Sequence, residues 1–124
     1  MSKYLIDTHI LLWWFFDDKN LKKNIREIIT NEENEIKVSI ASLWEITIKK
    51  SLNKLKAPDN LKEALEESNF QILPITLDHL RKLEHLPNLH NDPFDRLFIA
   101  QSIFEKLTFI TADKNIKKYK INNL

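Results

Sequence analysis

Five short segments of this chain place a carboxylate either directly after an expected strand or on the expected inward face of a helix. They are residues 4–9, 42–46, 90–93, 94–96 and 109–113. Carboxylates gathered in one cleft repel one another and remain ionised only if a cation lies among them. Oxygen atoms of this kind are also the ligands that hard divalent cations prefer. The pattern therefore predicts a metal site suited to metal-assisted hydrolysis.

Four of these acids also have an explanation that involves no ion. Asp7, Asp92 and Asp113 each precede an expected helix, where a carboxylate accepts hydrogen bonds from the first free amides. Asp92 is followed by Pro93, which favours the first helical position, so we interpret Asp92 mainly as a cap. Asp95 can complete an approximate capping box or favour the helix dipole.

Glu45 is harder to explain without an ion. In a helix over residues 41–52 it shares a face with Ala41, Ile48 and Leu52, which we expect to look inward. An unpaired carboxylate is costly there. The alternative is a surface ion pair with Lys49, one helical turn further along.

The elements that must position these acids alternate between strands and helices. Apolar runs predict strands at residues 3–6, 36–40, 70–73 and 108–111, and an edge strand at 119–121. Helical periodicity predicts helices at residues 8–16, 20–33, 41–52, 58–67, 76–83 and 93–106, and a helical turn at 113–118. Such an order predicts an α/β fold in which helices flank a mostly parallel sheet of four to five strands. Ligands of these sheets bind beyond the carboxyl ends of the strands, where Asp7 and Asp113 are expected.

Length and composition limit the class of protein. The 124 residues suffice for a single domain over 1–124, with 43% hydrophobic and 30% charged residues as in ordinary globular proteins. The absence of cysteine leaves oxygen and imidazole as metal ligands and suits the cytoplasm, and the apolar run 10–16 is too short to span a membrane. Without glycine, neither of the usual phosphate-binding loops can form. A net charge of +1 means that any nucleic-acid binding must rest on local basic patches, such as the one over residues 49–56.

The histidines and tryptophans carry less information. His9 and His90 flank the expected cleft, where either can be a polar contact or a donor to substrate. His79 and His85 are expected on the surface. The three tryptophans, Trp13, Trp14 and Trp44, are expected in the core or at an interface before any role in base stacking.

Taken together, the acidic motifs resemble those of PIN-domain proteins, especially the VapC-like toxin ribonucleases of bacterial toxin–antitoxin pairs. The resemblance covers essentially the whole chain and rests on Asp7 in Leu-Ile-Asp-Thr-His, Glu45 in Trp-Glu-Ile, Asp95 in Asp-Pro-Phe-Asp-Arg and Asp113 in Ile-Thr-Ala-Asp. It implies that these four acids are the catalytic residues and the ligands of Mg²⁺ or Mn²⁺. One departure is that Asp113 is followed by Lys-Asn-Ile-Lys-Lys, without the acidic or aromatic residues of many relatives, which implies a weaker second metal position.

The resemblance also implies an activity and partners. The chain would be an endoribonuclease that hydrolyses RNA phosphodiester bonds by in-line attack of activated water, with an antitoxin protein as partner and a homodimer as its assembly. Lys49, Lys50, Lys54 and Arg96 are the candidates for binding the RNA backbone. Thr8, His90, Asp92 and Thr111 are supporting candidates around the acids.

Two other classes remain open on the sequence. In the first, the chain is a binding module that keeps this fold and uses its acids only as helix caps. In the second, it is a phosphate-accepting receiver domain, suggested by the acids and by Thr111-Ala112. The receiver class ranks last, because the chain lacks paired acids after the first strand and a suitably placed lysine after a later strand.

Overall fold

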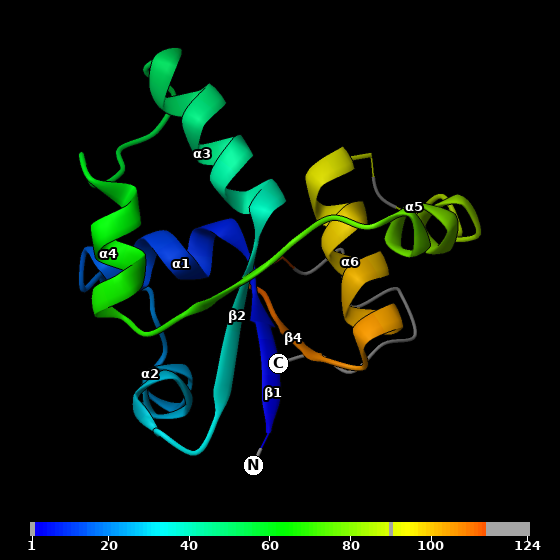
Figure 1. Cartoon of the computed structure of the whole chain (residues 1–124). Coiled ribbons are helices and arrows are strands. Elements are labelled where there is room, and N and C mark those ends of the chain that lie inside the picture. Colours follow the sequence, from blue (N-terminus) through cyan, green and yellow to red (C-terminus); the bar gives the residue numbers. More distant parts are fainter. Residues whose placement is uncertain (1, 90, 114–124) are drawn as a thin grey trace.

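A computed structural model describes residues 2–89 and 91–113 of the chain (Figure 1). Ten elements follow one another: β1 (Lys3–Ile6), α1 (Thr8–Phe15), α2 (Lys23–Thr30), β2 (Glu35–Ser39), α3 (Ile40–Ser51), α4 (Leu61–Glu67), β3 (Gln71–Leu73), α5 (Leu77–Glu84), α6 (Pro93–Glu105) and β4 (Thr108–Ile110). The expected turn and strand beyond Asp113 lie outside the described residues. Among the described helices, none combines the length and apolar character needed to cross a membrane.

The four strands form one parallel sheet in the order β3-β2-β1-β4. The first strand of the chain therefore lies inside the sheet, with Tyr4 opposite Ile36 of β2 on one side and Thr108 of β4 on the other. This arrangement confirms the expected α/β fold with a parallel central sheet. It also places the ends of β1 and β4, and hence Asp7 and Asp113, at the same edge.

Helices cover both faces of the sheet because side chains alternate along each strand. Ile6 packs with α1, α2 and α4 in one core cluster, and Leu5 packs with α5 and α6 in the other (Figure 1). Both side chains are fully buried. A strand covered on both faces reads as a continuous apolar run, which is why the sequence of β1 predicted a buried strand.

Two helices are shorter than predicted from the sequence. Helix α2 covers Lys23–Thr30 and not residues 20–33, because the segment before it folds into a turn in which the Asp18 carboxylate accepts a hydrogen bond from the Asn20 amide. Helix α4 begins at Leu61 and not at 58, because Asn60 caps it by accepting from the Glu63 amide at 3.1 Å. A side-chain to backbone bond thus caps the start of α4, whereas α2 begins after a turn without a side-chain cap.

Left-handed backbone positions are filled without glycine. Asp17, Asn53, Asn69 and Lys106 have φ between 50° and 58°. Asp and Asn tolerate this region better than other residues with a Cβ. Lys106 has no such advantage, and it ends α6 at a cost of roughly 1–2 kcal/mol.

His79 is fully buried, so the prediction that it lies on the surface is wrong. Its Nδ1 accepts from the Thr76 amide at 3.1 Å, which leaves the proton on Nε2, 2.7 Å from a carboxylate oxygen of Glu105. The ring thereby completes the cap of α5 and ties that helix to α6. His85, at the end of α5, is exposed as expected.

Because His79 fills buried space and joins two helices, its removal should be costly. We expect His79→Ala to lower the free energy of unfolding by about 2–4 kcal/mol, measured by urea denaturation. The control is His85→Ala, which should change it by less than about 0.5 kcal/mol. Equal effects of the two substitutions would contradict this assignment.

Candidate functional site

Asp7 stands at the carboxyl end of the central strand and caps α1. Its amide continues the sheet by donating to the Ile110 carbonyl at 3.1 Å, and its Oδ1 accepts from the Ile10 amide at 2.9 Å. The expected cap is therefore present. Because the Asp7 backbone is part of the ladder between β1 and β4, the register of the sheet fixes the position of its carboxylate.

The Asp7 carboxylate is only 4% exposed. Burial raises its pKa above the ordinary value, since desolvation disfavours the charged form. Hydrogen bonds from the Thr111 hydroxyl and from the Ile10 and Ala112 amides, together with the charge of His9, act in the opposite direction and are outweighed. Asp7 is thus a buried acid whose surroundings do not fully compensate its negative charge.

Glu45 lies on the buried face of α3, also 4% exposed. The prediction that this carboxylate points inward is confirmed. Its Oε1 accepts a hydrogen bond of 2.5 Å from the Thr8 hydroxyl. Since a hydroxyl has one hydrogen, the Ser42 hydroxyl, 3.1 Å from that of Thr8, donates back to it. Thr8 and Ser42 therefore hold Oε1 in place, and the supporting role of Thr8 in catalysis stays a prediction.

Lys49 pairs with the other oxygen of Glu45. The distance from Nζ to Oε2 is 2.6 Å. The ion pair between Glu45 and Lys49, which the sequence left open as the alternative to a buried Glu45, is therefore formed as well. It is not a surface pair, because the Glu45 side chain is 5% exposed and that of Lys49 is 35% exposed. The hydrogen bond to Glu45 raises the pKa of Lys49, and the charges of Glu45, Asp92 and Asp95 add to this effect against partial desolvation.

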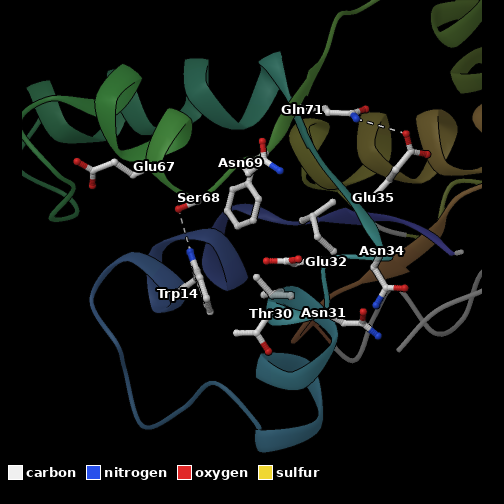
Figure 2. A pocket seen from close by; sticks show the side chains of 13 residues that line it. Trp14, Thr30, Asn31, Glu32, Asn34, Glu35, Glu67, Ser68, Asn69 and Gln71 are labelled. Atoms are coloured by element: carbon white, nitrogen blue, oxygen red, sulfur yellow. Dashed lines mark hydrogen bonds between the residues drawn. The ribbon is translucent and has the colours of Figure 1, made fainter.

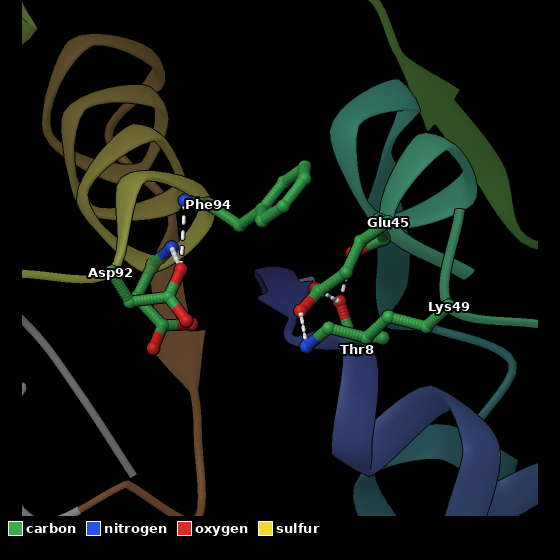
Figure 3. Close-up of polar contacts among 7 residues, drawn as sticks. Thr8, Glu45, Lys49, Asp92 and Phe94 are labelled. Carbon is green, nitrogen blue, oxygen red and sulfur yellow. Dashed lines mark hydrogen bonds and ion pairs between the residues drawn. The ribbon is translucent and has the colours of Figure 1, made fainter. Parts of the chain in front are cut away.

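Asp92 and Asp95 come from the start of α6, and Figure 3 shows Asp92 across the site from Lys49. Asp92 accepts from the amides of Phe94 and Asp95 at 2.8 and 3.2 Å, which confirms it as the cap of α6. Asp95 is half-buried in the first helical turn. Carboxylates of α3 and α6, from distant parts of the chain, thus both act on the charge of Lys49, and that of Glu45 contacts it directly.

Trp44 is 59% exposed, so it does not lie in the core, and the alternative place at an interface stays a prediction. Its ring meets that of Phe94 edge-on at 5.3 Å between centroids, joining α3 to α6 beside the acids. The buried face of α3 consists instead of Ala41, Ser42, Glu45 and Ile46. This pairing of the two rings was not predicted from the sequence, although their neighbours in the chain, Glu45 and Asp95, were both candidate ligands.

The other candidates are only partly gathered at the site. Thr111 is buried, contacts Asp7 as described, and accepts from the Asp113 amide at 3.0 Å. Lys50 donates to Asp59 and to the Pro58 carbonyl, while Lys54 is exposed. Arg96 is half-buried and donates to the Leu86 carbonyl at 3.4 Å. His90 lies outside the described residues.

The donor atoms fit a divalent cation in type and charge. They are carboxylate oxygens, as a hard ion requires, and the Lys49 ammonium group already stands in for a cation against Glu45. Within residues 2–89 and 91–113, however, no three side chains of the Asp, Glu or His type are grouped closely enough to hold one ion. Binding an ion would therefore require these side chains to rearrange.

A cavity of about 520 Å³ lies apart from these acids, where the segments before β2 and β3 meet Trp14 (Figure 2). Trp14 donates to the Ser68 hydroxyl at 3.0 Å, and Gln71 donates to Glu35 at 3.3 Å. The lining comes from the amino ends of the strands, opposite the edge that carries Asp7. None of the acids expected to act in catalysis contributes to this cavity.

Comparisons with known proteins agree with this geometry. The model of the PIN domain family matches residues 4–122. A VapBC2 structure from Rickettsia felis, bound to a promoter DNA fragment, superposes with a TM-score of 0.74 at 18% identity, covering 99% of this chain and 98% of that one. A toxin–antitoxin complex from Klebsiella pneumoniae gives 0.68 at 19% identity, covering 98% and 95%. A DNA-bound VapBC structure from Salmonella typhimurium gives 0.66 at 19% identity, covering 100% and 98%. A search of curated proteins gave no match.

The raised pKa of Asp7 predicts a specific pH dependence of stability. Because the unfolded carboxyl ionises near 3.8 and the folded one at higher pH, the folded state binds more protons between these values. The metal-free protein should therefore lose stability as pH rises through this window, whereas Asp7→Asn should lack this loss. We expect the unfolding free energy of Asp7→Asn, relative to the parent, to increase with pH in urea titrations with chelator. A difference independent of pH would contradict the assignment, and Asp78→Asn on the exposed face of α5 controls for the substitution itself.

Proposed function

The chain belongs to the PIN domain family, and from this premise we propose that it is a Mg²⁺- or Mn²⁺-dependent endoribonuclease that hydrolyses RNA phosphodiester bonds. The observation that carries the proposal is the burial of Glu45 on α3, beside the end of the central strand that bears Asp7. A buried carboxylate is costly in free energy unless hydrogen bonds, a paired charge or a metal ion compensate for its lost hydration. The two acids are 38 positions apart in the chain (45 − 7 = 38), yet Thr8, the residue after Asp7, donates a hydrogen bond to Glu45.

Asp7, Glu45, Asp95 and Asp113 would hold the metal. When bound, a divalent ion lowers the pKa of a water molecule and neutralises charge on the phosphate. The chain's own contribution is to fix the donors: Thr8 orients Glu45, and Thr111 contacts Asp7. The sheet edge and the first turn of α6 would carry the remaining two acids, Asp113 and Asp95.

The surface around the acids offers contacts for RNA. Lys54 is exposed after α3, Lys50 lies on α3, and Arg96 follows Asp95 in α6. Their charges can meet phosphates without reading base identity. Trp44 presents an exposed ring beside Phe94, on which a base can stack. These residues would position single-stranded RNA across the carboxylates.

We further propose that the chain is the toxin of a toxin–antitoxin pair and acts in the cytoplasm. The structures it resembles were solved as toxin–antitoxin complexes. Large apolar side chains are exposed on α5 and α6, namely Leu77 at 74%, Leu80 at 45% and Phe104 at 45%. Exposed apolar side chains of this kind suit an antitoxin segment or a second copy of the chain in a homodimer.

One observation favours a second candidate, a binding module without catalysis. Asp7 and Asp92 both act as helix caps in the structure, which is the role the binding module requires. Asparagine caps as well as aspartate, so a change to asparagine separates the two functions. Under the binding hypothesis such a change has little effect.

The nuclease hypothesis predicts loss of metal-dependent cleavage. Labelled single-stranded and structured RNAs should be cleaved by the parent protein with Mg²⁺ or Mn²⁺ and remain intact with chelator. Asp7→Asn should reduce the rate by about 100-fold or more, because it removes ligand charge while keeping the cap. Mn²⁺ should also raise the melting temperature of the parent more than that of the variant.

The control is Asp78→Asn, an equivalent change at an exposed position on α5. It should cleave RNA and respond to Mn²⁺ as the parent does. If Asp7→Asn retains full cleavage, or gains the same thermal stabilisation from Mn²⁺ as the parent, Asp7 is not a ligand.

A further inference from the structure

We propose that Lys49 is an internal counter-ion that holds the acidic site together in the metal-free protein and competes with the divalent metal for Glu45. This inference rests on the proposed metal site. It concerns one bond, between the Lys49 ammonium group and Oε2 of Glu45, at 2.6 Å.

The two oxygens of Glu45 have different partners. Oε1 is bound by Thr8, which Ser42 orients in turn, and both of these residues are buried. Oε2 has the Lys49 ammonium group as its contact among the described residues. Oε2 is therefore the oxygen that can turn to a metal without breaking the buried hydroxyl contacts, and it is the one that Lys49 covers.

The position of Lys49 follows from the helix. A residue four positions after Glu45 lies on the same side of α3, so the amino group returns to the carboxylate without any distortion of the backbone. Its stem is flexible, and its side chain is 35% exposed, so it can turn toward solvent when another cation takes its place on Glu45.

The ammonium group also faces acids from a second helix. The charges of Asp92 and Asp95, from the start of α6, act on it in the same direction as that of Glu45, with smaller effect. The ammonium group thus contacts a carboxylate of α3 and lies in the field of two carboxylates of α6. An incoming divalent ion meets the same carboxylates and is repelled by the ammonium group, so the two cations exclude each other.

The chain offers a matched control in the next residue. Lys50 carries the same charge on the same helix, but it pairs with Asp59 at 3.4 Å and with the Pro58 carbonyl, away from Glu45. Replacing either lysine by methionine changes the net charge equally. The difference between the two variants therefore isolates the contact with Glu45.

The test measures Mn²⁺ binding to the full chain by calorimetry, and melting with chelator, for the parent, Lys49→Met and Lys50→Met. We expect Lys49→Met to bind Mn²⁺ roughly tenfold more tightly than the parent, because a competing charge is removed. It should also melt at a lower temperature with chelator, since Glu45 is left buried without its partner. Lys50→Met should resemble the parent in both measurements.

Two further variants keep the test decisive. Lys49→Gln has no charge but can still donate to Glu45, so it replaces the methionine variant if that protein does not fold, and it should also bind Mn²⁺ more tightly. Lys49→Arg keeps the charge and should resemble the parent. Mn²⁺ binding by Lys49→Met or Lys49→Gln that is equal to or weaker than that of the parent overturns the proposal for Lys49 while the metal site stands. Absence of Mn²⁺ binding in every protein overturns the metal site itself and the proposed function with it.

Discussion

The cost of taking carboxylates out of water governs this site. Asp7 and Glu45 are both nearly inaccessible to solvent, and each needs hydrogen-bond donors or positive charge to remain ionised. The fold supplies donors to Asp7 from the backbone and from Thr111, and to Glu45 from Thr8 and Lys49. The arrangement of α1, α3 and the segment after β4 around the sheet edge brings these donors to the acids.

The two buried acids are compensated to different degrees. Glu45 has an ammonium group in direct contact, whereas Asp7 has mainly neutral donors, and burial still raises its pKa. Neutral dipoles can orient a carboxylate precisely but offset its charge incompletely. Asp7 is therefore the acid whose charge is least satisfied by the protein alone, and Glu45 is the acid whose partner must move before a second cation can approach.

Much of this arrangement could be predicted from local patterns. The bounds of β1, the caps at Asp7 and Asp92 and the inward direction of Glu45 depend on residues within one or two turns, and the structure has all of them. The side of α3 that would carry the tryptophan could not be predicted, because apolar residues occur around most of that helix and tertiary packing chose the face with Ala41 and Ile46. His79 was misplaced for a related reason: its partner Glu105 is 26 positions away, and no local pattern links them. The fit of four acids around an ion was an inference from their order in the chain and stays a prediction.

The strand order has a consequence for the time at which the site can form during synthesis. β1 is made first, yet it lies between β2 and β4, and β4 is the last described strand to leave the ribosome. The Asp7 amide binds the Ile110 carbonyl, so the edge that carries this acid is incomplete until translation has passed that residue. Nascent chains that stop before β4 contain Asp7 and Glu45 but lack both β4 and Asp113. The order of strands thus postpones assembly of the acidic edge until β4 has been synthesised.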